Sequence, residues 1–176
     1  SRMAVEHLIR LGHRDIGFVG GIPNLLVVQD RLAGYKQALE TYGLPLREEW
    51  VVETDFTELS GLVAVRSLLN QRPRPTALFC VDDLLAIAAL QAAEELGLHV
   101  PEDVAVLGVN DDPLAKLVRP RLTTIRVPMT DMGAVAAQLL LTQLGDIPNP
   151  FPSHQVILPV ELVVRESCGS WRVHSS

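Results

Sequence analysis

Four short apolar runs recur along this chain, and each is separated from the next by a segment with helical periodicity. The runs cover residues 15–20, 50–54, 76–81 and 104–109. Apolar runs without polar alternation are typical of strands whose two faces are both covered. Strands that alternate with helices form βαβ units, in which neighbouring strands are parallel and the crossovers are right-handed. The pattern therefore predicts an α/β fold built on a parallel sheet.

The intervening segments carry apolar residues at helical spacing. They predict helices over residues 4–11, 28–42 and 57–69, a fourth that begins after Asp82 or Asp83, and a fifth over residues 129–144. Gly12, Gly43 and Gly97 stand where a glycine commonly ends a helix. Beyond the fourth strand, residues 122–127 predict another extended segment and residues 156–164 a final strand.

Composition excludes several functional classes. Of the 176 residues, 15 are basic and 21 acidic, so the net charge is −6 and we expect no binding of nucleic acid by this chain itself. No apolar run approaches the ~18–20 residues that span a bilayer, so we expect no membrane association. The chain has no signal-peptide pattern, and its two cysteines form no disulfide framework, which favours a reducing cytoplasm.

Catalytic and cofactor motifs are missing from the sequence. Gly20-Gly21 after the first strand suggests a phosphate turn, but neither the G-x-G-x-x-G nor the Walker spacing is present. There is no G-x-S-x-G motif, and the five histidines lack metal-ligand spacing. We therefore expect no enzyme activity, no metal and no cofactor.

Polar side chains follow each of the four strands that the apolar runs predict. They are residues 21–24 with Arg31 beyond them, residues 55–57, residues 82–83 and residues 110–112. Because the carboxyl ends of parallel strands meet at one edge, ligands bind there in open α/β sheets. Amide, carboxylate and guanidinium groups beside an aromatic ring suit a polyol. The candidate ligand contacts are Arg31, Phe56, Asp82 and Asn110.

Several stretches also match a known family in the same order along nearly the whole chain. They are residues 101–104 (PEDV), the Gly108-x-Asn110-Asp111 turn, residues 120–124 (PRLTT) and residues 162–167 (LVVRES). In these residues the chain resembles the LacI/GalR family of bacterial transcription regulators, in the effector-binding, periplasmic-binding-protein-like domain.

The resemblance implies a domain organisation. The family's effector domain has two flavodoxin-like lobes joined by three crossovers, each lobe a parallel sheet with helices on both faces. Residues 1–120 and 151–168 would form the C-terminal lobe, residues 121–150 a crossover strand and helix of an incomplete N-terminal lobe, and residues 169–176 a flexible tail. The helix-turn-helix and most of the N-terminal lobe would be absent from this chain.

The resemblance also assigns contacts to the effector. Arg31 matches the arginine of an R-x-x-G-Y/W motif, and Phe56 matches the aromatic residue of a D-F/W motif. Asp82-Asp83 stands where the family has Asn-Asp, and Asn110-Asp111 where it has Asp-Asp. The carboxylate has therefore changed sides, which bears on the identity of the effector more than on the existence of a site.

Each candidate residue has a structural alternative. Arg31 could be a solvated helix residue near Asp30, and Phe56 could plug the edge of the core. One of the two adjacent aspartates is expected to cap the following helix, and we assign the cap to Asp83. Asn110 could hold a turn through an Asx bond. We expect Asp111 to be structural.

These observations favour the ligand-sensing and dimerisation domain of a LacI-type regulator that binds a small effector, expected to be a sugar. It would form a homodimer through the C-terminal lobe, using the helix after Asp83 and the loop of residues 113–120. Operator DNA would be bound by the absent N-terminal domain. The alternative is a sugar-binding protein of a transport system, which has the same two-lobed fold. A flavodoxin-like enzyme is the third class, and no reactive group supports it.

Overall fold

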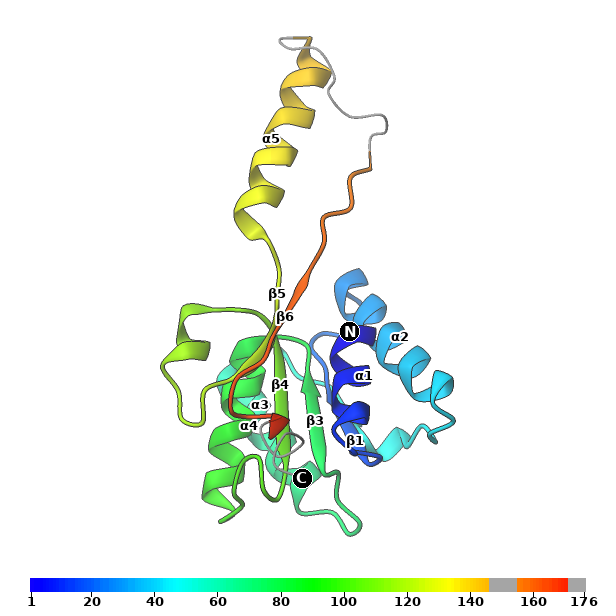
Figure 1. Ribbon diagram of the computed structural model, residues 1–176, viewed down its shortest axis with the longest axis vertical. Coiled ribbons are helices and arrows are strands. Elements are labelled where there is room, and N and C mark those ends of the chain that lie inside the picture. The colour runs from blue at the N-terminus through cyan, green and yellow to red at the C-terminus, as the bar shows by residue number, and fades with distance from the viewer. Residues whose placement is uncertain (146–154, 171–176) are drawn as a thin grey trace.

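A six-stranded sheet forms the centre of the computed structural model, which describes residues 1–145 and 155–170 (Figure 1). The strands are β1 (Ile16–Val19), β2 (Val51–Val52), β3 (Ala77–Cys80), β4 (Ala105–Asn110), β5 (Thr123–Arg126) and β6 (Glu161–Val163). Their order across the sheet is β2-β1-β3-β4-β5-β6. The pairings from β2 to β5 are parallel, as the βαβ pattern predicts, whereas β6 pairs with β5 in antiparallel fashion.

Helices cover both faces of the sheet. They are α1 (Arg2–Arg10), α2 (Leu26–Thr41), α3 (Glu58–Leu69), α4 (Asp83–Glu95) and α5 (Met129–Leu144), with short 3-10 turns η1 (Glu48–Trp50) and η2 (Pro113–Lys116). α1 packs beside α2 on one face, and α3 beside α4 on the other (Figure 1). The α/β prediction with helices on both faces is confirmed.

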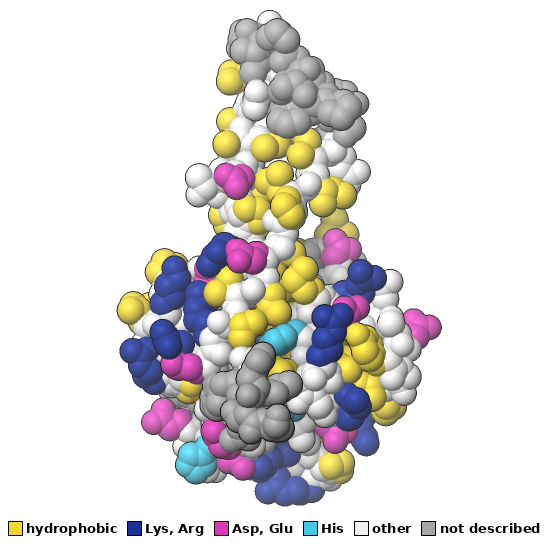
Figure 2. Space-filling model, in the orientation of Figure 1, with side chains coloured by type: hydrophobic (Ala, Val, Ile, Leu, Met, Phe, Trp, Pro, Cys, Tyr) yellow, Lys and Arg dark blue, Asp and Glu magenta, His cyan; other side chains and the backbone are white. Residues whose placement is uncertain are grey.

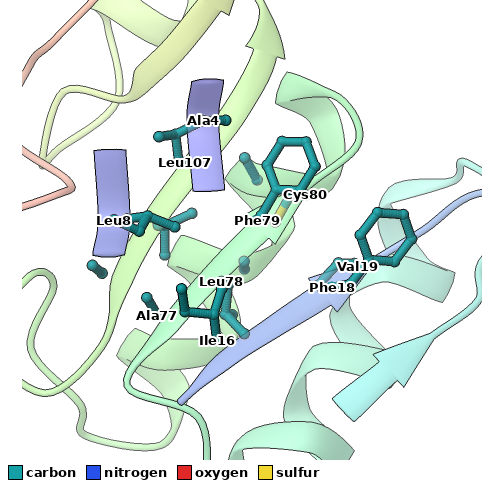
Figure 3. Packing of buried hydrophobic residues seen from close by; sticks show 14 of the residues in the cluster. Ala4, Leu8, Ile16, Phe18, Val19, Ala77, Leu78, Phe79, Cys80 and Leu107 are labelled. Carbon is teal, nitrogen blue, oxygen red and sulfur yellow. The ribbon is translucent and has the colours of Figure 1, made fainter. Parts of the chain in front are cut away.

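The core is mostly aliphatic and contains one small aromatic cluster, of which Phe18 and Phe79 are labelled in Figure 3. The ring of Phe18 lies 5.3 Å from that of Tyr35 and 5.9 Å from that of Phe79, measured between centroids. The buried hydroxyl of Tyr35 donates to the carbonyl of Ile16 at 2.8 Å. This bond satisfies the one polar atom of the cluster and fixes α2 against β1.

The predicted final strand over residues 156–164 is too long, because β6 spans only Glu161–Val163. A strand needs a paired neighbour, and β5 ends at Arg126, which lies opposite Glu161. Beyond that pair the two chain segments leave the sheet together. The correction therefore follows from the length of β5 rather than from residues 156–160 themselves.

Helix α5 projects away from the sheet together with residues 155–160 (Figure 1), and no residue of α5 is buried. Hydrophobic side chains gather over this projection, whereas charged side chains are more frequent on the body below it (Figure 2). A cavity of about 410 Å³ lies between α5 and the returning segment, lined by Met132, Val135, Ala136, Leu139, Val156, Leu158 and Val160 among others.

The assignment of residues 121–150 to an incomplete second lobe stays a prediction. Residues 146–154 and 171–176 lie outside the described part of the chain. The last residues of the 121–150 segment, and most of the tail that we predicted over residues 169–176, therefore fall outside the described residues.

Candidate functional site

The carboxyl ends of the parallel strands form one polar edge, as the strand pattern predicts. The register pairs Val19 with both Val52 and Cys80, so β2, β1 and β3 end side by side. Main-chain hydrogen bonds continue just past the strands, from Gly20 to Val52 at 2.8 Å and from Val81 to Val19 at 2.9 Å. Residues that follow these strands are therefore brought together by the sheet itself.

Arg31 extends from α2 to this edge. Its guanidinium group donates a hydrogen bond to the main-chain carbonyl of Val81, directly after β3. Burial lowers the pKa of Arg31, while the nearby carboxylates of Asp82 and Asp83 oppose that change. Arg31 is thus anchored beside Asp82 rather than extended into solvent.

Asp82, and not Asp83, caps α4. One carboxylate oxygen of Asp82 accepts from the backbone N–H of Leu85 at 2.8 Å, the usual N-cap bond. Burial raises the pKa of Asp82, and the Leu85 bond and the charge of Arg31 lower it. The assignment of the cap to Asp83 is wrong, because Asp83 is already the first residue of the helix and turns toward β5.

Phe56 lies over the end of β1. A side chain at Gly21 would meet the Phe56 ring at 2.1 Å, so the ring rests directly on the Gly21 backbone. Phe56 has a positive φ of 67° and its N–H donates to the hydroxyl of Thr54 at 3.2 Å. Phe56 is half-buried and packs against the core, so part of the residue remains accessible.

Asn110 ends β4 with a positive φ of 120°. Its side-chain Oδ1 is buried and has no hydrogen-bond partner among the described residues, so the Asx bond considered as the structural alternative is not formed. Asn110 lines a cavity of about 600 Å³ between the end of β4 and the start of α5, with Asp111, Asp112 and Arg126. Asn110 therefore contributes to the lining of this cavity, while its Oδ1 itself is buried.

The four predicted residues share the edge but not one cavity. Arg31 and Asp82 lie near enough beyond β3 to interact electrostatically, and Phe56 covers the end of β1. Asn110 lies on β4, the next strand of the sheet after β3. None of Arg31, Phe56 and Asp82 is among the described residues that line the 600 Å³ cavity.

Two arginines at this edge were not predicted from the sequence. Arg126, at the end of β5, donates to Asp111 at 2.8 Å and to Glu161 of β6 at 2.7 Å. Arg165, which follows β6, also donates to Asp111. Asp111 therefore has the structural role that we expected, and the ion pairs lower its pKa against the effect of burial. The position of Arg126 at the end of a strand could have indicated it. Arg165 lies in the LVVRES stretch that resembles the family, but that stretch did not indicate a contact with Asp111.

Other kinds of site are not seen in the described part of the chain. Residues 1–145 and 155–170 contain no group of three or more His, Cys, Asp or Glu side chains that could hold a metal ion. None of the helices in those ranges is long and apolar enough to cross a membrane.

A mostly parallel sheet with helices on both faces and a polar carboxyl edge defines an α/β ligand-binding domain. A family model described as the periplasmic-binding-protein-like domain matches residues 5–168, and the chain belongs to this family. The relatives it resembles are LacI-family transcription regulators, which confirms the resemblance found in the sequence.

The chain spans about half the length of the curated relatives it matches. The ribose operon repressor of Haemophilus influenzae is 39% identical over 169 residues, which are 96% of this chain and 50% of that protein. The HTH-type transcriptional repressor PurR of Pectobacterium carotovorum is 42% identical over 142 residues, 81% of this chain and 42% of that protein.

Solved structures agree with this assignment. A transcriptional regulator CelR–cellobiose complex superimposes with a TM-score of 0.87 at 37% identity, covering 94% of this chain and 50% of that one. The Escherichia coli transcriptional repressor ascG gives a TM-score of 0.83 at 32% identity, covering 94% of this chain and 59% of that one.

Proposed function

We propose that this chain is the ligand-sensing domain of a LacI-type transcription regulator, and that it binds a small sugar at the carboxyl edge of its sheet. Arg31, Phe56, Asp82 and Asn110 would contact the effector. The observation that carries the proposal is the polar carboxyl edge of the sheet, where Asn110 lines a cavity of about 600 Å³ in a chain that belongs to the periplasmic-binding-protein-like family. The Asn110 amide group offers both donors and an acceptor, which suit sugar hydroxyls.

The arrangement of charge supports a neutral, hydroxyl-rich ligand. Arg31 is partly neutralised by Asp82, and Arg126 and Arg165 are paired with Asp111. Each of these arginines thus has a carboxylate close by, which disfavours an anionic ligand. The half-exposed face of Phe56 offers an apolar surface for the C–H face of a sugar ring.

The partners of the whole protein form part of the proposal. Relatives of this chain are named as repressors, which favours a regulator over the binding protein of a transport system. The 176 residues have a net charge of −6, which does not favour contact with DNA phosphates, so operator DNA would be bound by a segment outside them. The regulator would act in the cytoplasm as a homodimer joined through the C-terminal lobe. Effector binding would change operator affinity only if it favours one lobe arrangement over the other.

Calorimetry with D-ribose and cellobiose tests the site directly. These sugars are chosen because one relative is named as a ribose operon repressor and another is complexed with cellobiose. Arg31→Ala should weaken binding by about 2–3 kcal/mol, the scale of a charge-assisted hydrogen bond lost from a partly buried site. Arg10→Ala removes an arginine from the exposed side of α1 and is the matched control.

Two results would contradict the proposal. Equal affinity in the Arg31→Ala and Arg10→Ala chains would remove Arg31 from the site. Absence of binding across a panel of monosaccharides and disaccharides that begins with these two would exclude the sugar as effector.

A further inference from the structure

Two consecutive residues that are not glycine have positive φ at the end of β4. Asn110 has a φ of 120° and Asp111 a φ of 58°. Such conformations are strained for residues with a side chain, and they persist only where surrounding contacts over-determine them. Two carboxylates hold this segment: that of Asp83, from the start of α4, and that of Asp111 itself.

Asp83 holds the segment through the residue that follows it. It is 1% exposed, and its two oxygens accept from different elements: the hydroxyl of Thr124 on β5 at 2.6 Å and the N–H of Asp112 at 2.7 Å. The bond to Asp112 holds the backbone immediately after the two strained residues. Asp83 therefore joins the start of α4, the loop after β4 and the middle of β5.

Gly108 leaves the space that Asp83 occupies. A Cβ atom at Gly108 would lie 2.3 Å from Oδ1 of Asp83. The strand that leads into Asn110 thus has a glycine where the carboxylate approaches, and only a residue without a side chain allows that approach.

Asp111 fixes the segment from the other side. Its carboxylate accepts from Arg126 of β5 and from Arg165 after β6, and its N–H lies 3.4 Å from the hydroxyl of Thr124. Arg165 is held in turn, because it donates to the carbonyl of Leu122 at 2.7 Å and its N–H donates to the hydroxyl of Thr123 at 2.9 Å. Asp111 is thereby tied to both strands through which the chain leaves and re-enters the sheet.

We propose that Asp83 and Asp111 are positioning residues that together hold Asn110 in its left-handed conformation beside the cavity where the effector would bind. The inference rests on the proposed function for its ligand, but the geometry of Asn110 can be measured without one. Rotation of the Asn110 backbone would break the bonds that tie the following residues to Asp83, to β5 and to the segment after β6.

Nuclear magnetic resonance of the labelled chain tests the proposal without a ligand. The three-bond coupling between the amide and α protons reports φ at Asn110 and Asp111, and the exchange rate of the Asp112 amide reports its bond to Asp83. Asp83→Asn places an amide N–H₂ or a weaker acceptor at the Asp112 N–H, and Asp111→Asn removes the charge that both arginines contact. Each change should alter both couplings, shift the Asn110 side-chain amide signals and speed exchange at Asp112, while amides of β1 and β3 keep their rates.

Calorimetry on the same variants connects the geometry to binding. Whichever of D-ribose and cellobiose binds the unaltered chain should bind both variants about tenfold more weakly, the effect of one hydrogen bond lost. Arg31→Ala, which removes a proposed contact, should weaken binding and leave the Asn110 couplings unchanged. If neither sugar binds, the couplings alone decide the role of Asp83 and Asp111.

Unchanged couplings and unchanged Asp112 exchange in both variants would overturn the proposal. Should the Asp83→Asn chain fail to fold, Thr124→Val gives the same information, since it removes one bond to Asp83 and preserves the volume of a fully buried residue. Restoration of the couplings in Arg165→Lys, beside their loss in Arg165→Met, would show that charge at Asp111 rather than packing maintains the conformation. Unaltered couplings in a chain that carries both Arg126→Met and Arg165→Met would contradict the role of Asp111, because both of its ion pairs would then be absent.

Discussion

Two carboxylates near the polar edge have pKa values that are shifted in opposite directions, because their surroundings differ. Asp55 is exposed, and hydrogen bonds from Ser60 and Thr57 lower its pKa to about 2. Asp83 is buried, and burial raises its pKa to about 6 despite the bonds from Thr124 and Asp112. The charges of Asp111 and Asp112 add to that rise. Two groups on other elements favour the charged form of Asp83: the guanidinium of Arg31 on α2 and the hydroxyl of Thr124 on β5.

We expect Asp83 to make the protein less stable as the pH rises from about 4 to about 6. An unfolded aspartate titrates near pH ~3.9, so in this window the folded state retains a proton that the unfolded chain has lost. The free energy of unfolding should fall by up to about 3 kcal/mol relative to Asp83→Asn, at about 1.4 kcal/mol for each pKa unit. Urea unfolding of both chains at pH 4, 5, 6 and 7 measures the difference. Parallel curves for the two chains would show that Asp83 titrates normally.

Gly108→Ala should be strongly destabilising. The new methyl group would lie 2.3 Å from Oδ1 of Asp83, 3.1 Å from Cβ of Ala86 and 3.2 Å from the Leu122 side chain. We expect a loss of about 2–4 kcal/mol, the range of core overpacking together with a broken buried hydrogen bond. Gly133→Ala is the control, because nothing lies within 4 Å of its Cβ position. Chemical denaturation gives both values, and similar stabilities for the two variants would contradict the close approach at Gly108.

Single residues also show what the sequence could and could not predict. Arg31 and Phe56 were placed at the edge because each follows a strand end or a local motif, and strand ends converge in a parallel sheet. Arg165 could not be found in this way, since it reaches Asp111 across 54 positions of sequence. The cap was assigned to the wrong one of two adjacent aspartates, because the choice depends on the register of the first turn of α4.

At the level of elements, periodicity predicted each of the five helices and the six strands, and the errors lie at their ends. The exposed apolar surface expected of α4 is smaller than its sequence suggests. Leu85 and Ala88 are fully buried, and a Cβ at Gly61 of α3 would meet them at 2.8 and 3.1 Å. The glycine lets α3 approach closely and cover that face, which a pattern within α4 alone cannot reveal.

We therefore expect the proposed dimer to use the loop of residues 113–120, which contains η2, more than α4. Leu117 is 70% exposed and Leu114 is 50% exposed, beside the end of β4. Leu117→Glu should shift the chain toward monomer in sedimentation at micromolar concentration, because a charge would be buried in the interface. Leu26→Glu alters a leucine of α2 with 77% exposure and serves as the control. An unaltered chain that is monomeric at these concentrations would exclude self-association through this surface.

At the scale of the whole molecule, the body and the α5 projection differ in how they are stabilised. Leu107 of β4 is fully buried, whereas Leu140 of α5 is 57% exposed. Leu107→Ala should cost about 2–5 kcal/mol, and Leu140→Ala should stay within about 0.5 kcal/mol of the unaltered chain. Thermal or urea unfolding compares them. A loss above about 2 kcal/mol for Leu140→Ala would mean that α5 packs on the body of the same molecule.

The antiparallel pairing of β5 with β6 has a consequence for how the chain is partitioned. Arg126 and Glu161 face each other where the two strands leave the sheet, so everything between them begins and ends at one point. Topologically, that long excursion takes the place of the loop of a β-hairpin. Loop closure entropy grows only slowly with length, so the sheet can accept insertions of very different size at this position. The length of the segment between Arg126 and Glu161 can therefore change without altering the strand on which Asn110 lies.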